Sequence, residues 1–267
     1  MNKAIAIIGC GWLGLPLAES LQKDGYQIYG STTSERKLNV LREVEITPFL
    51  ISLSESAIHG DIDSFLKEVD VVVINVPPKL RGGSSENYVK KMALLHKAIK
   101  TSEVQKIVFV SSTSVYGDIE GEVTEETHPS PVTKSGRQLL TSENIFRKDD
   151  ALQTTIVRFG GLIGADRHPI NMLSGKRGLS NGNHPINLIH LNDCVQILRS
   201  IIKKNWWNEI FNGVFPHHPK KRDYYIFEAK KRGSQVPDFK EDNVRKGKIV
   251  RSNRLISVKN YTFTTTL

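Results

Sequence analysis

The stretch Ile7-Ile8-Gly9-Cys10-Gly11-Trp12-Leu13-Gly14 decides the fold of this chain, because its G-x-G-x-x-G pattern joins an apolar strand to a helix. Gly9 permits a tight turn, Gly11 lets the backbone approach a pyrophosphate, and Gly14 lets the helix pack closely on the strand. The backbone N–H groups around Trp12 and Leu13 then face the phosphates at the positive end of the helix dipole. The pattern alone is weak. Its position after the apolar residues 4–8 nevertheless predicts a dinucleotide site rather than an ordinary strand–helix turn.

Short apolar runs alternate with amphipathic runs through the first 160 residues. We predict strands at residues 4–8, 27–29, 47–50, 69–75, 106–111 and 155–158, and helices at residues 13–23, 35–43, 86–100 and 133–147. The strands are rich in Val and Ile and do not alternate with polar residues, which is typical of parallel strands buried on both faces. This order predicts an α/β fold of the Rossmann type with a doubly wound parallel sheet.

The pattern loosens after Arg158, where glycines and prolines punctuate a loop-rich segment before a helix predicted at residues 193–203. We therefore divide the chain into a Rossmann domain, residues 1–159, and a smaller C-terminal substrate lobe, residues 160–267. The lobe is not expected to be a fully separate domain. It should lie over the C-terminal edge of the sheet, where open α/β sheets carry their ligand crevice.

The composition is that of an ordinary globular protein, with 39% hydrophobic and 24% charged residues. No apolar run reaches the roughly 20 residues of a membrane span, and the apolar start lacks a signal-peptide cleavage pattern. Cys10 and Cys194 have no metal-binding or redox spacing. We expect a cytoplasmic protein with reduced thiols, no metal and no membrane attachment.

The net charge of +9 is unevenly distributed. Residues 1–150 contain 17 Lys/Arg and 20 Asp/Glu, whereas residues 151–267 contain 20 and 8. Such asymmetry predicts an anionic partner for the C-terminal half, either a phosphorylated or nucleotide-linked small molecule or nucleic acid, with a solvated basic face as the alternative. Nucleic acid is the weakest of these, because the chain lacks the interleaved aromatic and basic residues of a stacking platform.

The end of the second strand favours NADP(H) over NAD(H). A site selective for NAD places Asp or Glu about 20 residues after the glycine motif, where it binds the ribose hydroxyls. This chain instead has Ser31, Thr32, Thr33 and, further on, Arg36, whose forked guanidinium suits a 2′-phosphate. The same hydroxyls can also cap the next helix, and both roles are compatible. The fourth strand ends in Asn75-Val76-Pro77, a loop expected beside the nicotinamide half of the cofactor.

Two further segments carry a resemblance to a known family. Ser111-Ser112-Thr113-Ser114-Val115-Tyr116-Gly117-Asp118 follows the fifth strand, and Leu188-Ile189-His190-Leu191-Asn192-Asp193 lies in the lobe. With the glycine motif they resemble the extended short-chain dehydrogenase/reductase superfamily, the NAD(P)-dependent epimerase/dehydratase group that acts on nucleotide sugars. Within it, YeeZ-type bacterial proteins share G-W-L-G, S-S-T-S-V-Y-G-D and a segment like Ala165-Asp166-Arg167-His168-Pro169. By analogy, such chains form homodimers through helices matching residues 86–100 and 133–147.

The resemblance also shows an atypical active site. In the family a Tyr-x-x-x-Lys pair on the helix after the serine run moves the substrate proton and binds the nicotinamide ribose. Here Ser135 and Leu139 stand at those two positions, while Gly136 and Glu143 match the family pattern. A serine hydroxyl is a poor base without help, and a leucine neither donates a hydrogen bond nor carries charge. The standard dehydrogenase mechanism is therefore not expected.

Ser112 matches the family serine that hydrogen-bonds the reacting substrate oxygen, although serines at a strand end also satisfy backbone groups. Tyr116 is expected to be structural. Arg167 and His168 are candidates for binding a substrate phosphate or carboxylate. His190 is a further candidate, with a structural role beside a helix-capping Asp193 as the alternative.

Three functions remain in competition. The first is an NADP(H)-dependent oxidoreductase or epimerase-like enzyme with a rearranged catalytic set. The second is a non-catalytic NADP(H)-binding sensor or regulatory protein, and the third is a nucleic-acid-binding protein. The retained Ser112 favours the enzyme, and the missing pair favours the sensor.

Overall fold

The computed structural model describes residues 4–78, 86–241 and 246–267. Seven parallel strands form the central sheet in the order β12-β9-β7-β6-β1-β2-β3. Their bounds are β1 Ala4–Ile8, β2 Gln27–Thr32, β3 Thr47–Leu50, β6 Val69–Ile74, β7 Lys106–Ser112, β9 Gln153–Phe159 and β12 Ile210–Gly213. The order reverses between β1 and β6, which confirms the predicted doubly wound Rossmann-type sheet.

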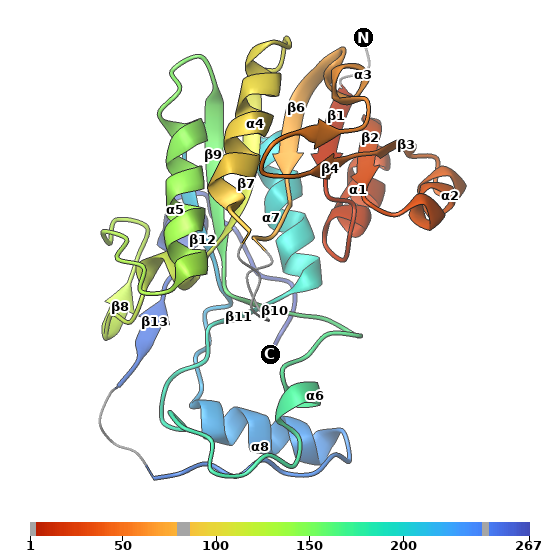
Figure 1. The fold of residues 1–267 in the computed structure, drawn as a ribbon. Helices are drawn as coiled ribbons and strands as arrows, with labels where there is room; N and C mark the ends of the chain where they lie inside the picture. The colour runs from red at the N-terminus through yellow and green to blue at the C-terminus, as the bar shows by residue number, and fades with distance from the viewer. Residues whose placement is uncertain (1–3, 79–85, 242–245) are drawn as a thin grey trace.

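Helices cover both faces of this sheet (Figure 1). On one face lie α1 Gly14–Gln22, α2 Glu35–Glu43 and α7 Leu191–Lys203, and on the other lie α3 Ile62–Leu66, α4 Tyr88–Lys100 and α5 Lys134–Arg147. Successive β1 residues alternate between the two faces of the sheet. Ile5 and Ile7 belong to the hydrophobic core under α1 and α7, whereas Ala6 and Ile8 belong to the core under α4 and α5. The Val- and Ile-rich strands are therefore buried on both sides, as their sequence predicts.

The smaller lobe lies beyond the C-terminal edge of the sheet (Figure 1). It contains β10 Gly161–Ile163, α6 Ile170–Leu173, β11 Leu188–His190 and α8 Lys221–Lys231, around a core that includes Ile170, Tyr224 and Phe239. Two elements after residue 159 lie in the layered unit instead: α7 packs on α1, and β12 pairs with β9. The substrate lobe predicted from residue 160 onward is therefore interrupted by part of the Rossmann layers.

Several short elements complete the structure. They are β4 Ser52–Leu53 with β5 Ile58–His59, β8 Gly121–Val123 with β13 Lys248–Val250, the 3₁₀ turn η1 Thr113–Tyr116 and the π-helical turn η2 Arg254–Val258. The β8–β13 pair matters most for the site, because it joins the segment after β7 to a strand near the end of the chain.

Candidate functional site

The glycine loop lies at the topological switch point between β1 and β6. Gly9 has a positive φ of 97°, and a Cβ there would lie 2.6 Å from the carbonyl oxygen of Asn75. A Cβ on Gly14 would lie 2.2 Å from the carbonyl oxygen of Gly9. By contrast, a Cβ on Gly11 would meet no described atom within 4 Å. Packing within the chain therefore requires glycine at positions 9 and 14. At Gly11 the space beside the backbone is open, so a pyrophosphate could come close to the backbone there.

Neighbouring strands brace this loop from both sides. The Gly9 N–H donates to Ser31 Oγ at the end of β2 (3.0 Å), and Asn75 Nδ2 after β6 donates to the Gly9 carbonyl oxygen (3.0 Å). Among the described residues, no side chain caps the N-terminus of α1, where Leu13 is the N-cap residue. The described residues therefore fit a dinucleotide: hydrogen bonds from two strands brace the loop, and the uncapped helix end presents backbone donors to an anion.

The polar side chains at and after the end of β2 are of two kinds: some are buried and hydrogen-bonded to the backbone, and others are exposed to solvent. Ser31 is buried, and its hydroxyl accepts from the Gly9 N–H. Thr32 Oγ1 accepts from the Ser34 N–H (3.2 Å). Ser34 is the N-cap residue of α2, but its side chain makes no capping hydrogen bond. Thr33 and Arg36 are exposed at the start of α2. Of the residues predicted to bind a 2′-phosphate, only these last two present their side chains to solvent.

The loop after β6 has a mainly structural set of contacts. The Val76 carbonyl oxygen accepts from Tyr88 Oη (2.8 Å), so it ties the loop to the first turn of α4. Pro77 is exposed. Asn75 was predicted to contact the cofactor. Its side-chain amide instead bonds the Gly9 carbonyl oxygen and so stabilises the glycine loop.

The turn after β7, which carries Ser112, packs against the helix that carries Ser135 and Leu139. Ser112 is half-buried, and its Oγ accepts from the Ser114 N–H (3.2 Å), which leaves the hydroxyl hydrogen able to donate. A Cβ on Gly136 would lie 2.8 Å from the Ser114 carbonyl oxygen, so the first turn of α5 packs directly on this turn. The half-buried Ser135 precedes Gly136 in the chain, and Leu139, one helical turn on, is buried in the core.

An amine that we did not predict reaches the same turn. Lys248 on β13 donates through Nζ to the carbonyl oxygens of Thr113 (3.4 Å) and Gly117. The Asn187 side chain fixes its strand by bonding the Lys248 carbonyl oxygen and the Val250 N–H. Burial lowers the pKa of the Lys248 ammonium. Sequence reasoning missed Lys248 because only the β8–β13 pairing brings it to η1.

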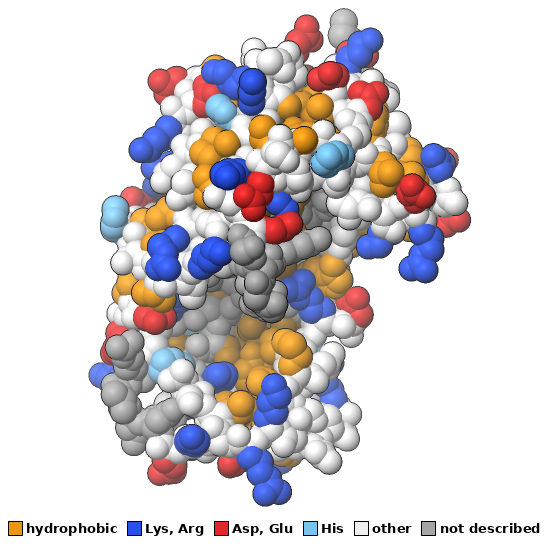
Figure 2. Space-filling view, viewed as in Figure 1, with side chains coloured by type: hydrophobic (Ala, Val, Ile, Leu, Met, Phe, Trp, Pro, Cys, Tyr) orange, Lys and Arg blue, Asp and Glu red, His pale blue; other side chains and the backbone are white. Residues whose placement is uncertain are grey.

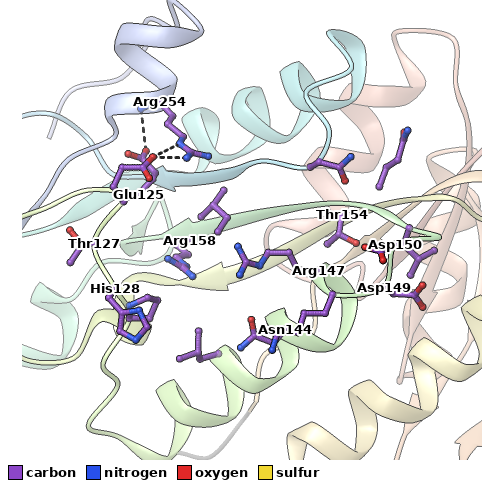
Figure 3. A pocket seen from close by; sticks show the side chains of 18 residues that line it. Glu125, Thr127, His128, Asn144, Arg147, Asp149, Asp150, Thr154, Arg158 and Arg254 are labelled. Atoms are coloured by element: carbon purple, nitrogen blue, oxygen red, sulfur yellow. Dashed lines mark hydrogen bonds and ion pairs between the residues drawn. The ribbon is translucent and has the colours of Figure 1, made fainter.

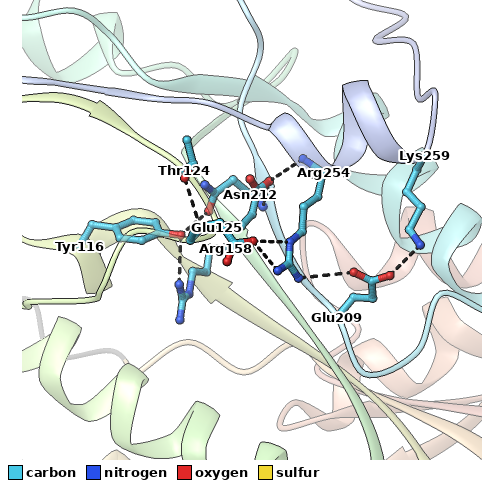
Figure 4. A network of polar contacts seen from close by, with 9 residues as sticks. Tyr116, Thr124, Glu125, Arg158, Glu209, Asn212, Arg254 and Lys259 are labelled. Atoms are coloured by element: carbon cyan, nitrogen blue, oxygen red, sulfur yellow. Dashed lines mark hydrogen bonds and ion pairs between the residues drawn. The ribbon is translucent and has the colours of Figure 1, made fainter.

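A buried polar network joins Tyr116, Arg158 and Asn212 (Figure 4). Arg158 donates to both carboxylate oxygens of Glu143 and, through a terminal nitrogen, to Tyr116 Oη (3.0 Å). Tyr116 Oη donates in turn to Asn212 Oδ1 (2.9 Å). Ser111 Oγ donates to Glu143 Oε1 (2.5 Å), so the network reaches the strand end that carries Ser112. Tyr116 is fully buried and burial raises its pKa, which agrees with the structural role expected for it.

The three residues predicted to bind substrate, Arg167, His168 and His190, lie in different surroundings and make different contacts. His168 lies inside it, with its Nε2 bonded to Tyr224 Oη (2.9 Å) and its pKa lowered by burial. His168 is therefore buried, whereas a residue that binds a ligand must be accessible. His190 is the N-cap residue of α7 and accepts from the Asn192 N–H through Nδ1 (3.2 Å). Only Arg167 is exposed, and its guanidinium stacks on the Trp12 ring with 5.0 Å to the centroid.

Asp193 does not cap α7. It is fully buried, and its carboxylate accepts from the N–H groups of Thr264 (2.8 Å) and Thr265 (3.2 Å). These contacts hold the segment 261–267 at the N-terminal end of α7, and this segment ends between the sheet and the lobe (Figure 1).

A separate groove of about 830 Å³ runs along the C-terminal half of α5 (Figure 3). Its lining includes Asn144, Arg147 and Asp149, with Arg254 on the opposite wall, and contains none of the glycine-loop residues. Acidic and basic side chains both line it, so it has no charge preference that suits a dinucleotide. On the molecular face in Figure 2, the Lys and Arg side chains of the lobe are scattered rather than gathered into one patch.

The described residues contain no cluster of three or more His, Cys, Asp or Glu that could hold a metal ion. Within the same part of the chain, none of the helices is both long enough and apolar enough to cross a membrane.

Comparisons with known proteins agree with this geometry. The sequence model of the family described as NAD(P)H-binding matches residues 9–187. Protein YeeZ of Escherichia coli (strain K12) is 34% identical over 256 residues, covering 95% of this chain and 93% of that protein. The "Uncharacterized UDP-glucose epimerase YtcB" of Bacillus subtilis (strain 168) is 24% identical, covering 76% of this chain and 73% of that protein.

A similar solved structure is UDP-glucuronic acid 4-epimerase from Bacillus cereus in complex with UDP-glucuronic acid and NAD. It superposes with a TM-score of 0.81 at 19% identity, covering 98% of this chain and 95% of that one. The likeness confirms the epimerase/dehydratase fold, and the 34% identity to YeeZ confirms the resemblance seen in the motifs.

Proposed function

This chain belongs to the NAD(P)H-binding family, and on that premise we propose that it is an NADP(H)-dependent enzyme of epimerase/dehydratase descent. Its substrate is a phosphorylated or nucleotide-linked small molecule, and its reaction is an oxidoreduction or epimerisation with an atypical catalytic set. The braced glycine loop with the open space at Gly11 is the observation that carries the proposal. YtcB and the Bacillus cereus enzyme, whose names refer to UDP-sugars, support the substrate class.

Exposed Thr33 and Arg36 support the preference for NADP(H) over NAD(H). They lie at the start of α2, at the β2 end where an NAD site has its carboxylate, and a guanidinium there favours the 2′-phosphate. A charged hydrogen bond of this kind contributes about 1.5–3 kcal/mol. Arg36→Ala should therefore weaken NADPH binding about 10- to 100-fold and leave NADH binding almost unchanged.

Isothermal titration calorimetry with both cofactors tests this preference. Arg42→Ala is the matched control, because Arg42 lies on the same helix and is exposed but bonds Asn39 (2.7 Å). An Arg36→Ala variant that binds NADPH as well as the native chain does would overturn the NADP(H) preference.

The catalytic part of the proposal assigns proton handling to Ser112 and Lys248. The nicotinamide ring, when bound, supplies hydride transfer. Ser112 orients the substrate oxygen through its hydroxyl, while Lys248 brings to η1 the cationic group that the buried Leu139 does not provide. Its lowered pKa moves that amine toward the range where a lysine exchanges protons.

Turnover of UDP-sugars in the presence of NADPH or NADP⁺ tests the enzyme. Ser112→Ala and Lys248→Met should each reduce the rate at least about 100-fold while the cofactor Kd stays within twofold. Lys246→Met, which removes an exposed lysine two positions away, is the control.

The second candidate is a non-catalytic NADP(H)-binding sensor or regulatory protein. Its support is the burial of Leu139, which packs in the core where the family has a catalytic lysine. It predicts NADPH binding, no turnover with any UDP-sugar, and no effect of Ser112→Ala on any measured property.

A further inference from the structure

The tip of the lobe contacts the cofactor loop directly. Trp12 Nε1 donates to Asp166 Oδ1 (2.7 Å), across 154 residues of chain. The neighbouring Arg167 places its guanidinium 5.0 Å from the centroid of the Trp12 ring. Gly164 completes the contact, because a Cβ there would lie 2.8 Å from a Trp12 ring carbon. A hydrogen bond, a cation–π contact and close packing therefore all meet on one indole.

This tip is well anchored. Gly164 and Arg167 exchange backbone hydrogen bonds, from the Gly164 N–H to the Arg167 oxygen (2.8 Å) and from the Arg167 N–H to the Gly164 oxygen (3.3 Å). We call residues 164–167 the tip loop. His168, which follows it, is buried against Tyr224 in the lobe core. The loop thus presents Arg167 from a fixed base, although the Arg167 side chain itself is exposed.

Arg167 makes no direct ion pair with a carboxylate among residues 4–78, 86–241 and 246–267, and the adjacent Asp166 carboxylate is bonded to the indole. Trp12 itself belongs to the glycine loop, and the uncapped N-terminus of α1 follows immediately. A guanidinium without a carboxylate partner therefore lies over the loop whose backbone donors face an anion.

We propose that Arg167, held on the tip loop and positioned by its stacking on Trp12, is a ligand of the cofactor pyrophosphate. The inference rests on the proposed function only in requiring that the chain binds NAD(P)(H). A forked guanidinium binds two oxygens of a diphosphate at once. This assignment moves Arg167 from the substrate, where its sequence position first suggested it, to the cofactor.

The pyrophosphate is common to NADPH, NADH and ADP-ribose, which separates this residue from Arg36. Arg167→Ala should weaken all three ligands about 10- to 100-fold, whereas Arg36→Ala should affect only NADPH. Arg167→Lys should recover part of the loss, since it keeps the charge without the fork. Arg177→Ala, an exposed arginine on the same lobe, is the matched control and should leave all three dissociation constants unchanged.

Trp12 provides an independent readout. In a Trp206→Phe/Trp207→Phe background Trp12 is the remaining tryptophan of the chain, so its emission reports on the glycine loop and on the tip loop stacked on it, and Arg167→Ala in this background separates the two contributions. ADP-ribose should change the emission of this background protein, and Asp166→Ala should alter the starting emission and reduce the change. Circular dichroism of each variant checks that it is folded.

The outcomes are distinguishable. If the native chain binds none of the three ligands, the proposed cofactor function itself fails. If it binds them and folded Arg167→Ala binds all three equally well, Arg167 is no pyrophosphate ligand and the inference is overturned. A loss confined to UDP-sugar binding would also overturn it and return Arg167 to the substrate.

Discussion

Replacing Glu143 by Gln should strongly destabilise this protein, because it leaves the Arg158 guanidinium charged and buried without a counter-charge. The two side chains are 2% and 3% exposed, and the shortest contact between them is 2.6 Å. Removing one partner of such a buried pair costs about 3–5 kcal/mol, whereas an exposed pair contributes about 0–1 kcal/mol. We therefore expect Glu143→Gln to lower the free energy of unfolding by about 3–5 kcal/mol.

The assay is urea denaturation at pH 7, followed by far-UV circular dichroism and extrapolated linearly to water. Glu122→Gln is the control, because the Arg251–Glu122 contact has the same 2.6 Å length but is 36% and 62% exposed. The double variant Glu143→Leu/Arg158→Met should cost less than Glu143→Gln, since no buried charge remains. A loss below about 1 kcal/mol for Glu143→Gln would refute the reasoning.

Three further predictions concern other parts of the chain. Gly11→Ala should leave the unfolding free energy within about 1 kcal/mol of the native value but weaken NADPH binding at least tenfold, whereas Gly14→Ala should impair both, as calorimetry and urea denaturation would show. Asp24 has its pKa lowered to about 2, mainly by the Arg199 guanidinium. Its contribution is therefore present above its usual pKa near 4 and lost as the pH falls to 2, so Asp24→Asn should cost about 1–2 kcal/mol at pH 7 and almost nothing at pH 2 in urea titrations. Asp193→Ala should release the segment 261–267, which limited proteolysis would detect as early cleavage there; resistance equal to the native chain would contradict its tethering role.

The sheet was largely predictable because its central strands are buried on both faces. The strands at residues 4–8 and 47–50 and the helix at residues 35–43 were predicted with their observed bounds, since continuous apolar runs and amphipathic periodicity are local signals. β12 was missed because it follows the loop-rich part of the chain and its sequence, Ile-Phe-Asn-Gly, contains only two apolar residues. Its assignment to the sheet depends on pairing with β9, which is a long-range contact.

The candidate site was predictable only in part, for a similar reason. The glycine motif is a local signal, so Gly9, Gly11 and Gly14 were predicted from their spacing together with their position between an apolar strand and a helix. The bracing roles of Ser31 and Asn75 depend on which strands lie next to β1 and were therefore not visible in the sequence.

The elements that brace the glycine loop differ from those that carry the candidate catalytic positions. The glycine loop is held by β2 and β6, whereas Ser135 and Leu139 lie on α5, which packs on the turn after β7. A substitution on α5 therefore leaves the hydrogen bonds that brace the loop intact. Leu139 contributes apolar packing to the core at a position that would otherwise bury a charge, while the amine of Lys248 approaches the η1 turn from β13. If this chain turns over a substrate, the cation at that turn comes from the C-terminal strand and not from the helix, and Lys248→Met is the variant that separates the enzyme from the sensor.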